Sequence, residues 1–182
     1  MLLCYVISKQ LVAYLDTNGL YWKYQSDYRA AHSTETTLTA VFSALIQEMD
    51  ASNITLLSLL DLSATFDCAD HEILLNRLRI TYGLESTVIN WFASYLSDRT
   101  QSVHHDGRFL AKSTMQFGVP QGSILGPLMF LLYTADIAKL IVHRGLSPHL
   151  CADDTQMFIG CRPGNTHLLR DTTLSCISNN EE

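Results

Sequence analysis

Apolar residues recur with the 3.6-residue period of an amphipathic helix in residues 32–50, and this segment is the clearest predicted helix of the chain. Ser33 or Thr34 can cap its first turn, and Glu35 suits the positive end of the helix dipole. The apolar positions that follow the period are Leu38, Val41, Phe42, Leu45, Ile46 and Met49. An apolar helix face needs another layer to pack on, so the pattern predicts a sheet.

Three further segments carry helical patterns, residues 70–80, 86–96 and 123–140. Asp70 and Ser86 stand where the N-cap residues of the first two helices are expected. Pro127 should lie in the first turn of the third helix or kink it. The chain is therefore rich in helices, which are separated by segments of a different pattern.

Extended segments are predicted at three places. Residues 54–62 form an almost unbroken apolar run, typical of a strand buried on both faces, and Asp61 lies at its end. An Asp-Gly pair at 106–107 lies between two extended segments and predicts a hairpin. An Asp-Asp pair at 153–154 predicts the tip of a second hairpin. The order of elements predicts an α+β fold in which helices pack on one face of an antiparallel sheet.

The composition fits one globular domain over residues 1–182, because 47% of the residues are hydrophobic and can form a sizeable core. No internal repeat or Pro/Gly-rich linker divides the chain. The formal net charge of −6 argues against a free-standing nucleic-acid binder, since phosphate binding relies on clustered Lys and Arg.

The cysteines and the N-terminal segment indicate the cellular setting. The five cysteines are odd in number and include no CxxC pair, which suggests neither a disulfide framework nor a zinc site. The start has too short an apolar run and no charged leader for a signal peptide, and no stretch reaches membrane-spanning length. We therefore expect an intracellular protein, nuclear or cytoplasmic, that is not secreted and binds no membrane.

The adjacent carboxylates of Asp153 and Asp154 admit two interpretations. Acidic residues are common in turns, where their side chains bond nearby backbone. Alternatively, a divalent metal offsets the repulsion between them, and Mg²⁺ prefers such hard oxygen ligands. Asp61 is the natural third carboxylate if its strand lies beside the hairpin. A triad of this kind could hold two ions for an in-line phosphoryl displacement, either nucleotidyl transfer or phosphodiester hydrolysis.

Flanking motifs resemble those of one known family. The reverse transcriptase domain of non-LTR (LINE-type) retrotransposons has motifs similar to LLDLSATFDCADHEILL, GVPQGSILGPLMFLLY and CADDTQMF, in this order and at this spacing. The resemblance covers residues 9–159. It implies a polymerase fingers–palm fragment, with fingers in residues 1–50, palm in 51–160, an incomplete C-terminal segment in 161–182 and no thumb.

The resemblance also implies roles for individual residues. Asp61, Asp153 and Asp154 would be catalytic and would hold two Mg²⁺ ions, which Mn²⁺ could replace. Phe66 resembles the residue that lies under the sugar of the incoming nucleotide and excludes a 2′-hydroxyl, with simple core packing as the alternative. Arg29 resembles a fingers residue that contacts the triphosphate. One further segment resembles the loop that touches the template strand and the incoming nucleotide. Its residues are Gly118, Val119, Pro120, Gln121 and Gly122.

The implied reaction is RNA-directed DNA synthesis. A primer 3′-hydroxyl would attack the α-phosphate of a deoxynucleoside triphosphate, with one Mg²⁺ near the hydroxyl and the second at the leaving pyrophosphate. The implied partners are an RNA template, a DNA primer, dNTPs and the other domains of the parent retrotransposon polyprotein. Basic surfaces in those other domains would account for the acidic charge of this chain.

Some positions depart from the family's pattern. Cys151 stands where an aromatic residue usually precedes Ala-Asp-Asp, and Asp27 places a negative charge two residues from Arg29. These departures, with the missing thumb, leave an alternative open, namely a catalytically inactive remnant that only folds or binds another chain. A two-metal nuclease is a third interpretation, disfavoured because Phe66 and the GVPQG loop would then have no task.

Overall fold

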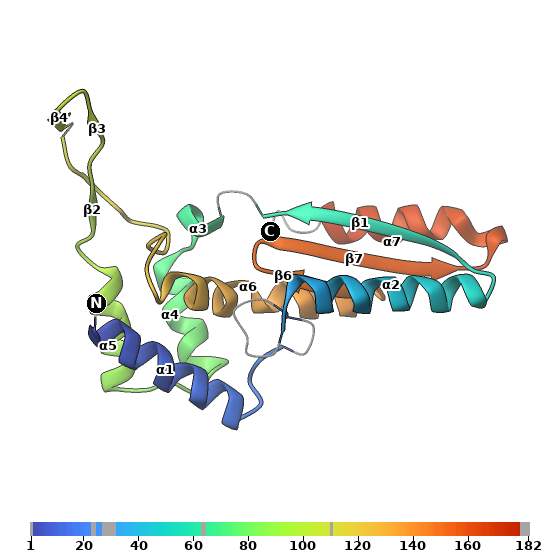
Figure 1. Cartoon of the computed structure of the whole chain (residues 1–182), viewed down its shortest axis with the longest axis horizontal. Coiled ribbons are helices and arrows are strands. Elements are labelled where there is room, and N and C mark those ends of the chain that lie inside the picture. The colour runs from blue at the N-terminus through green and yellow to red at the C-terminus, as the bar shows by residue number, and fades with distance from the viewer. Residues whose placement is uncertain (1, 23–24, 27–31, 63–64, 110, 179–182) are drawn as a thin grey trace. The chain divides into compact units, whose positions relative to one another are not determined.

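Figure 1 shows the chain as a computed structural model that describes residues 2–22, 25–26, 32–62, 65–109 and 111–178. The helices are α1 (Leu2–Thr17), α2 (Thr34–Asp50), α3 (Thr65–Cys68), α4 (His71–Ile80), α5 (Thr87–Leu96), α6 (Gly126–His143), the 3-10 helix η1 (Pro163–Asn165) and α7 (Thr166–Ser178). The strands are β1 (Ile54–Asp61), β2 (Thr100–Gln101), β3 (His104–His105), β4 (Arg108–Phe109), β5 (Ser113–Thr114), β6 (Ser147–Cys151) and β7 (Asp154–Cys161).

These elements form two compact units. The first unit consists of Met1–Leu20 and Ala64–Tyr133, and the second of Tyr21–Ser63 and Thr134–Glu182. The boundary falls within α6, so this helix contributes its N-terminal part to the first unit and its C-terminal part to the second. The division into fingers, palm and C-terminal segments rests on resemblance and stays a prediction.

A three-stranded antiparallel sheet forms the centre of the second unit, with the strand order β1–β7–β6. The register pairs Ile54 with Cys161 at one end of β1 and Asp61 with Asp154 at the other. β7 is the middle strand and pairs with β6 through the hairpin predicted from the sequence. The predicted α+β class with an antiparallel sheet is therefore confirmed.

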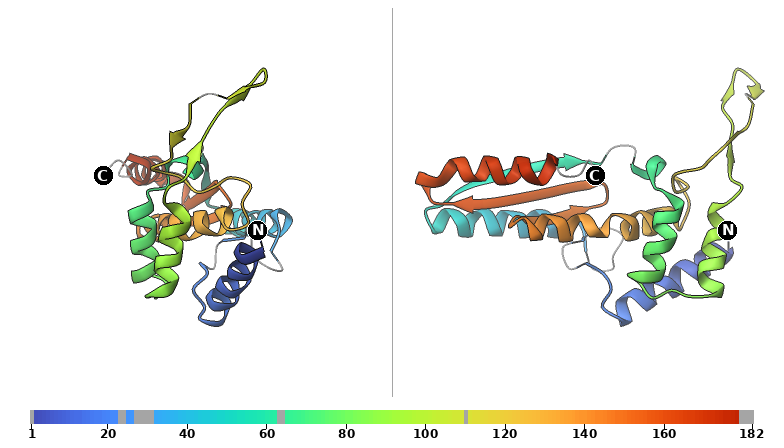
Figure 2. Two further views of the ribbon diagram at one scale, coloured as in Figure 1. Left: turned by 90° about the vertical axis from the view of Figure 1, so that its left-hand side faces the viewer. Right: turned by 180° about the vertical axis from the view of Figure 1, so that it is seen from behind.

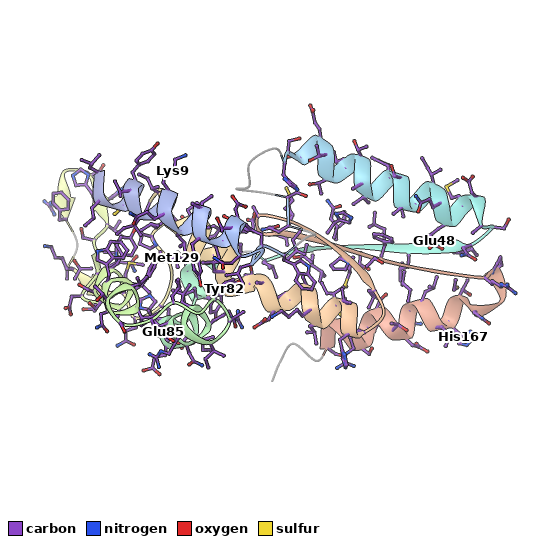
Figure 3. All side chains as sticks on the ribbon, turned by 90° about the horizontal axis from the view of Figure 1, so that it is seen from below. Lys9, Glu48, Tyr82, Glu85, Met129 and His167 are labelled. Atoms are coloured by element: carbon purple, nitrogen blue, oxygen red, sulfur yellow. The ribbon has the colours of Figure 1, made fainter. Side chains whose placement is uncertain are left out.

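Helices lie on both faces of this sheet, whereas the sequence analysis expected them on one. Met157 of β7 packs with Ile141 of α6 and Cys176 of α7 on the first face. Gly160 has the opposite parity on β7, and a Cβ built there would collide with Glu48 of α2. Figure 3 shows α2, with Glu48, and α7 on opposite sides of the strands. The expectation was wrong because a helical period reveals an apolar stripe but not the sheet face that it covers.

β1 is half-buried on one face and largely exposed on the other, contrary to the expectation for residues 54–62. Its burial alternates along the strand, and Leu59 is 70% exposed while Leu60 packs against the core cluster of the second unit. β1 is an edge strand whose leucines occupy both faces. An unbroken apolar run therefore does not establish burial on both faces.

The first unit is built on helices α1, α4 and α5. Its buried side chains include Leu11 and Leu15 of α1, Leu74 and Leu78 of α4, and Phe92 and Leu96 of α5. The hydroxyl of Tyr14 donates to the carbonyl of Tyr82 at 2.8 Å, which ties α1 to the chain after α4. A ribbon formed by β2–β5 extends beyond α5 and continues into the β3–β4 hairpin (Figure 2).

Helix starts match the predicted caps in two of three places. Ser33 caps α2 in a reciprocal capping box with Thr36, and Asp70 accepts hydrogen bonds from the first backbone N–H groups of α4. Ser86 stands before α5 as predicted, but it has a φ of 50° and makes no side-chain capping bond. A cap prediction fails here because a left-handed backbone does not orient the hydroxyl as an extended one does.

The start of α6 and the predicted hairpin turn also agree with the sequence analysis in their main features. Pro127 lies in the first turn of α6, which begins at Gly126 rather than at Ser123. The Ser123 hydroxyl accepts from the Gly126 N–H at 2.9 Å and so acts as a cap. Asp106 and Gly107 both have positive φ, as a type I′ hairpin turn requires.

Among the longer helices, α1 and α7 were not predicted. α1 has apolar residues around most of its surface, and α7 places Thr173 and Cys176 at its buried positions beside Leu169. The spacing of these three residues follows the helical period. A count of strongly apolar residues misses this period, because it includes Leu169 but not Thr173 and Cys176.

α6 is an exception to the expectation that no segment reaches membrane-spanning length. Within the described residues it is the one helix whose length and composition alone would permit a crossing, and half of its residues are buried inside the structure. A core helix of a globular protein has the same length, composition and burial.

Substitutions at two methionines test which residues form the core of the second unit. Met157 is fully buried and Met49 on α2 is 70% exposed. Met157→Ala should lower the free energy of unfolding by about 2–5 kcal/mol, because it leaves a cavity. Met49→Ala, the matched control, should change it by less than about 0.5 kcal/mol. Urea unfolding followed by circular dichroism measures both, and equal effects would contradict the assigned core.

Candidate active site

Asp61 and Asp154 are direct partners across the β1–β7 pairing. The next pair along is hydrogen-bonded, since the Leu62 N–H donates to the carbonyl of Asp153 at 3.1 Å. Hydrogen-bonded and non-hydrogen-bonded pairs alternate in an antiparallel ladder, so Asp61 and Asp154 form a non-hydrogen-bonded pair. Side chains at such a pair share one face and approach each other more closely than those of the neighbouring pairs. The register therefore places two carboxylates side by side.

Asp153 lies in the turn before β7, and Asp154 is the first residue of the strand rather than part of the tip. The turn consists of Ala152 and Asp153, between the paired residues Cys151 and Asp154. Ala152 has a φ of 54°, a conformation that costs an L-residue roughly 1–2 kcal/mol. The bond from Leu62 to the Asp153 carbonyl holds this strained turn against the end of β1.

A pocket of about 190 Å³ lies at the pair. Its lining residues are Leu59, Leu60, Asp61, Asp154, Thr155 and Gln156. Thr155 is 1% exposed, and within the described residues its hydroxyl oxygen has no hydrogen-bond partner. The pocket therefore combines carboxylates at the surface with a buried polar atom.

The carboxylate pair fits a magnesium ion in donor chemistry. Mg²⁺ usually takes one or two protein carboxylates and completes its octahedron with water and phosphate oxygens. Asp61 and Asp154 supply that number. No group of three or more His, Cys, Asp or Glu among the described residues is arranged to hold a metal ion, so Asp153 as a third ligand stays a prediction.

β6 adds two residues to the same face of the sheet. Cys151, half-buried, is the partner of Asp154 across the β6–β7 pairing. The ring of His149 lies nearly parallel to that of Phe158, with centroids 6.4 Å apart. Burial lowers the pKa of His149. Its imidazole is therefore neutral at pH 7 and brings no positive charge to the aspartates.

The predicted nucleotide-contacting loop is fixed by α3, the residue that follows it and the start of α4. The Gly118 N–H donates to the carbonyl of Ala69 at 2.8 Å, and the Val119 N–H to that of Phe66 at 2.7 Å. Nε2 of His71 lies 2.7 Å from the carbonyl oxygen of Gly118. Two motifs far apart in the sequence thus form one structure. The sequence analysis did not predict that His71 contacts this loop. The only local signal is its position next to the cap residue Asp70.

Gly118 occupies a position that no larger residue fits. Its φ is 91°, and a Cβ there would lie 2.9 Å from the carbonyl oxygens of both Phe66 and Asp67. Burial then decreases along the loop: Gly118 and Val119 are buried, Pro120 is half-buried, and Gln121 and Gly122 are exposed. The loop is anchored at its start and presents the Gln121 amide, both a donor and an acceptor, at the surface.

Phe66 is half-buried and stacks on Phe130 of α6, with ring centroids 4.3 Å apart and planes 9° from parallel. This contact realises the packing role that the sequence analysis left as the alternative, and the role as a sugar gate stays a prediction. Arg29 and Asp27 lie outside the described residues. Phe66 and the loop belong to the first unit, and the three aspartates belong to the second.

Alanine substitutions at two loop glycines should separate crowding from backbone strain. Gly122 has a positive φ but nothing within 4 Å of a built Cβ, so Gly122→Ala should cost about 1–2 kcal/mol of unfolding free energy. Gly118→Ala should cost clearly more, because it also meets two carbonyl oxygens. Thermal unfolding measures both, and equal losses would show that the loop is not pressed against Phe66 and Asp67.

Removing one charge of the carboxylate pair should stabilise the metal-free protein. Like charges directly opposite in a sheet are destabilising. In EDTA, Asp154→Asn should therefore raise the free energy of unfolding by up to about 1 kcal/mol. Asp171→Asn on the exposed part of α7 is the control and should have little effect. A clear loss of stability in Asp154→Asn would contradict close like-charge pairing.

Comparison with known proteins bears on the chain as a whole. The family model described as "Reverse transcriptase (RNA-dependent DNA polymerase)" matches residues 2–177. The chain is 29% identical over 134 residues to the probable RNA-directed DNA polymerase from transposon X-element of Drosophila melanogaster. It is 26% identical over 132 residues to the RNA-directed DNA polymerase from mobile element jockey of the same species. These alignments cover 74% and 72% of this chain and 14% of each relative.

A solved structure supports the fold. Apo telomerase from Candida tropicalis, truncated from its C-terminal domain, matches 98% of this chain and 36% of its own, with a TM-score of 0.67 and 14% identity. The family match and the transposon relatives confirm the resemblance drawn from the LLDLSATFD, GVPQG and CADD motifs. The chain belongs to the reverse transcriptase (RNA-dependent DNA polymerase) family.

Proposed function

We propose that this chain is the fingers–palm core of an RNA-directed DNA polymerase, which transfers deoxynucleotides to a primer 3′-hydroxyl. The observation that carries the proposal is the direct pairing of Asp61 with Asp154, with Asp153 in the adjoining turn. Two carboxylates at a directly opposed pair offer oxygen ligands to a divalent cation, which would offset their repulsion. Membership in the reverse transcriptase family supports the same conclusion.

The three aspartates would hold the metal ions. Asp61 and Asp154 offer their carboxylates on one face of the sheet, and Asp153 adds a third from the turn. When bound, Mg²⁺ or Mn²⁺ supplies stabilisation of the negative charge that develops on the attacking and leaving oxygens of phosphoryl transfer. The hydrogen bond from Leu62 to Asp153 fixes the turn relative to β1, so that the carboxylates are positioned before any ligand arrives.

The loop Gly118–Gly122 would contact the template strand and the incoming nucleotide. Its buried start is held by the carbonyls of Ala69 and Phe66, which leaves the Gln121 amide exposed for a base or sugar. Phe66 would lie under the sugar and reject a 2′-hydroxyl, and its stacking on Phe130 would keep the ring rigid. Arg29 would contact the triphosphate. These roles rest on the family resemblance.

The substrates would be an RNA template, a DNA primer and dNTPs, and the other domains of a retrotransposon polyprotein would act as partners. The chain spans about one seventh of the length of the X-element and jockey relatives. An intracellular setting, nuclear or cytoplasmic, suits the five cysteines, none of which forms a disulfide.

Primer extension tests the proposal. The purified chain is given a labelled DNA primer annealed to an RNA template, dNTPs and Mg²⁺ or Mn²⁺. The wild type should extend the primer. Asp153→Asn should reduce extension at least about 100-fold, since it removes a carboxylate that stabilises the transition state. Asp171→Asn is the control and should retain extension.

A folded protein is required for any conclusion, so circular dichroism and thermal unfolding accompany each variant. Equal extension by wild type and Asp153→Asn would overturn the catalytic assignment. No extension by a folded wild type would favour the alternative, a non-catalytic remnant that folds or binds another chain. The half-buried Cys151 opposite Asp154 is the observation that favours this second candidate, since an aromatic residue is usual there in the family.

A further inference from the structure

The ribbon that follows α5 differs in charge from the rest of the chain. Residues 99–112 contain Arg99, Arg108 and Lys112 but only one acidic residue, Asp106, and so have a net charge of +2. Because the whole chain has −6, all other residues together have −8. We call residues 99–114 the basic ribbon. In both views of Figure 2 it extends away from α5.

The register of the β3–β4 hairpin separates two kinds of side chain at the end of the ribbon. His105 pairs with Arg108, and His104 pairs with Phe109. Successive strand residues point to opposite faces, so His105 and Arg108 lie on one face and the aromatic pair of His104 and Phe109 on the other. The rings of His104 and Phe109 are 4.6 Å apart between centroids and tilted by 40°.

These side chains are open to solvent. Phe109 is 75% exposed, and the His105 side chain is 83% exposed while it lies 3.4 Å from the Asp106 carboxylate. At the base of the ribbon, by contrast, the Arg99 guanidinium lies over the ring of Tyr95 and donates to its carbonyl. Arg99 therefore braces the ribbon, whereas the hairpin presents a large apolar ring that the described structure leaves exposed.

Cations together with exposed rings form a surface for single-stranded nucleic acid. Lys and Arg attract phosphates, and bases that are not paired in a duplex stack on aromatic side chains. An acidic protein segment would pair with the cations, whereas every nucleotide of a single strand brings both a phosphate and a base that can stack on the His104–Phe109 ring pair. The combination therefore favours nucleic acid over a peptide.

We propose that the basic ribbon binds single-stranded nucleic acid, with Arg108 and Lys112 on the phosphates and an unpaired base stacked against Phe109. The inference rests on the proposed function in one respect, because a polymerase of this family gives such a strand a reason to be present. The binding itself requires neither the aspartates nor a metal ion.

Fluorescence anisotropy of the full chain with a labelled single-stranded oligonucleotide, titrated in EDTA at several salt concentrations, tests the ribbon. Arg108→Ala and Lys112→Ala should each weaken binding and lower the magnitude of the salt slope by about 0.7. Phe109→Ala should weaken binding about 5- to 100-fold and leave the slope unchanged. Arg170→Ala removes an exposed cation from α7 and should have no effect.

Heparin, a polyanion without bases, separates stacking from charge. Phe109→Ala should leave heparin affinity unchanged, and an equal loss for heparin and oligonucleotide would overturn the stacking contact. Equal oligonucleotide affinity of wild type and all three ribbon variants, or no binding by wild type, would overturn the proposal.

The two proposals fail separately. Binding that depends on the ribbon in a protein without primer extension would leave the ribbon assignment standing and remove the polymerase assignment. If all ribbon variants extend the primer and bind the oligonucleotide as wild type does, the polymerase assignment stands and the ribbon assignment is removed.

Discussion

The candidate site depends on the strand register that sets Asp61 directly opposite Asp154 in the central sheet of the second unit. Like charges at this position work against the pairing of β1 with β7, so other contacts must hold the register. Met157, further along β7, supplies them by packing with Ile141 and Cys176. A slip of one residue would turn Met157 to the opposite face. The apolar core thus stabilises the very register that the carboxylates oppose.

The sequence reveals those features that depend on residues close together in the chain. The caps at Ser33 and Asp70 were predictable, since each requires only one side chain and the next few N–H groups. Ser86 fits the same pattern but fails, because its backbone conformation is set by the path of the chain into α5. Motif spacing was equally informative about the family, since the reverse transcriptase family model matches residues 2–177, which contain all three motifs.

Features that depend on distant residues could be anticipated only in part. The meeting of Asp61 with the hairpin was a hypothesis from the sequence, whereas its non-hydrogen-bonded register follows from a single bond between Leu62 and Asp153. Likewise, the need for glycine at position 118 is explained by the carbonyl of Phe66, which no local pattern places beside the loop. The candidate site is thus predicted as a set of residues but not as a geometry.

The order in which the chain visits its two units has a consequence for its synthesis. The chain leaves the first unit after Leu20, returns to it at Ala64 and leaves again after Tyr133, so neither unit is a continuous segment. β1 must wait for β7, and at about 5–20 residues per second the ribosome needs roughly 5–20 s to make the intervening chain. Through that interval the nascent chain carries an apolar strand with an unpaired edge. Its vulnerability to aggregation should therefore be greatest during translation, before Asp154 and the rest of β7 emerge.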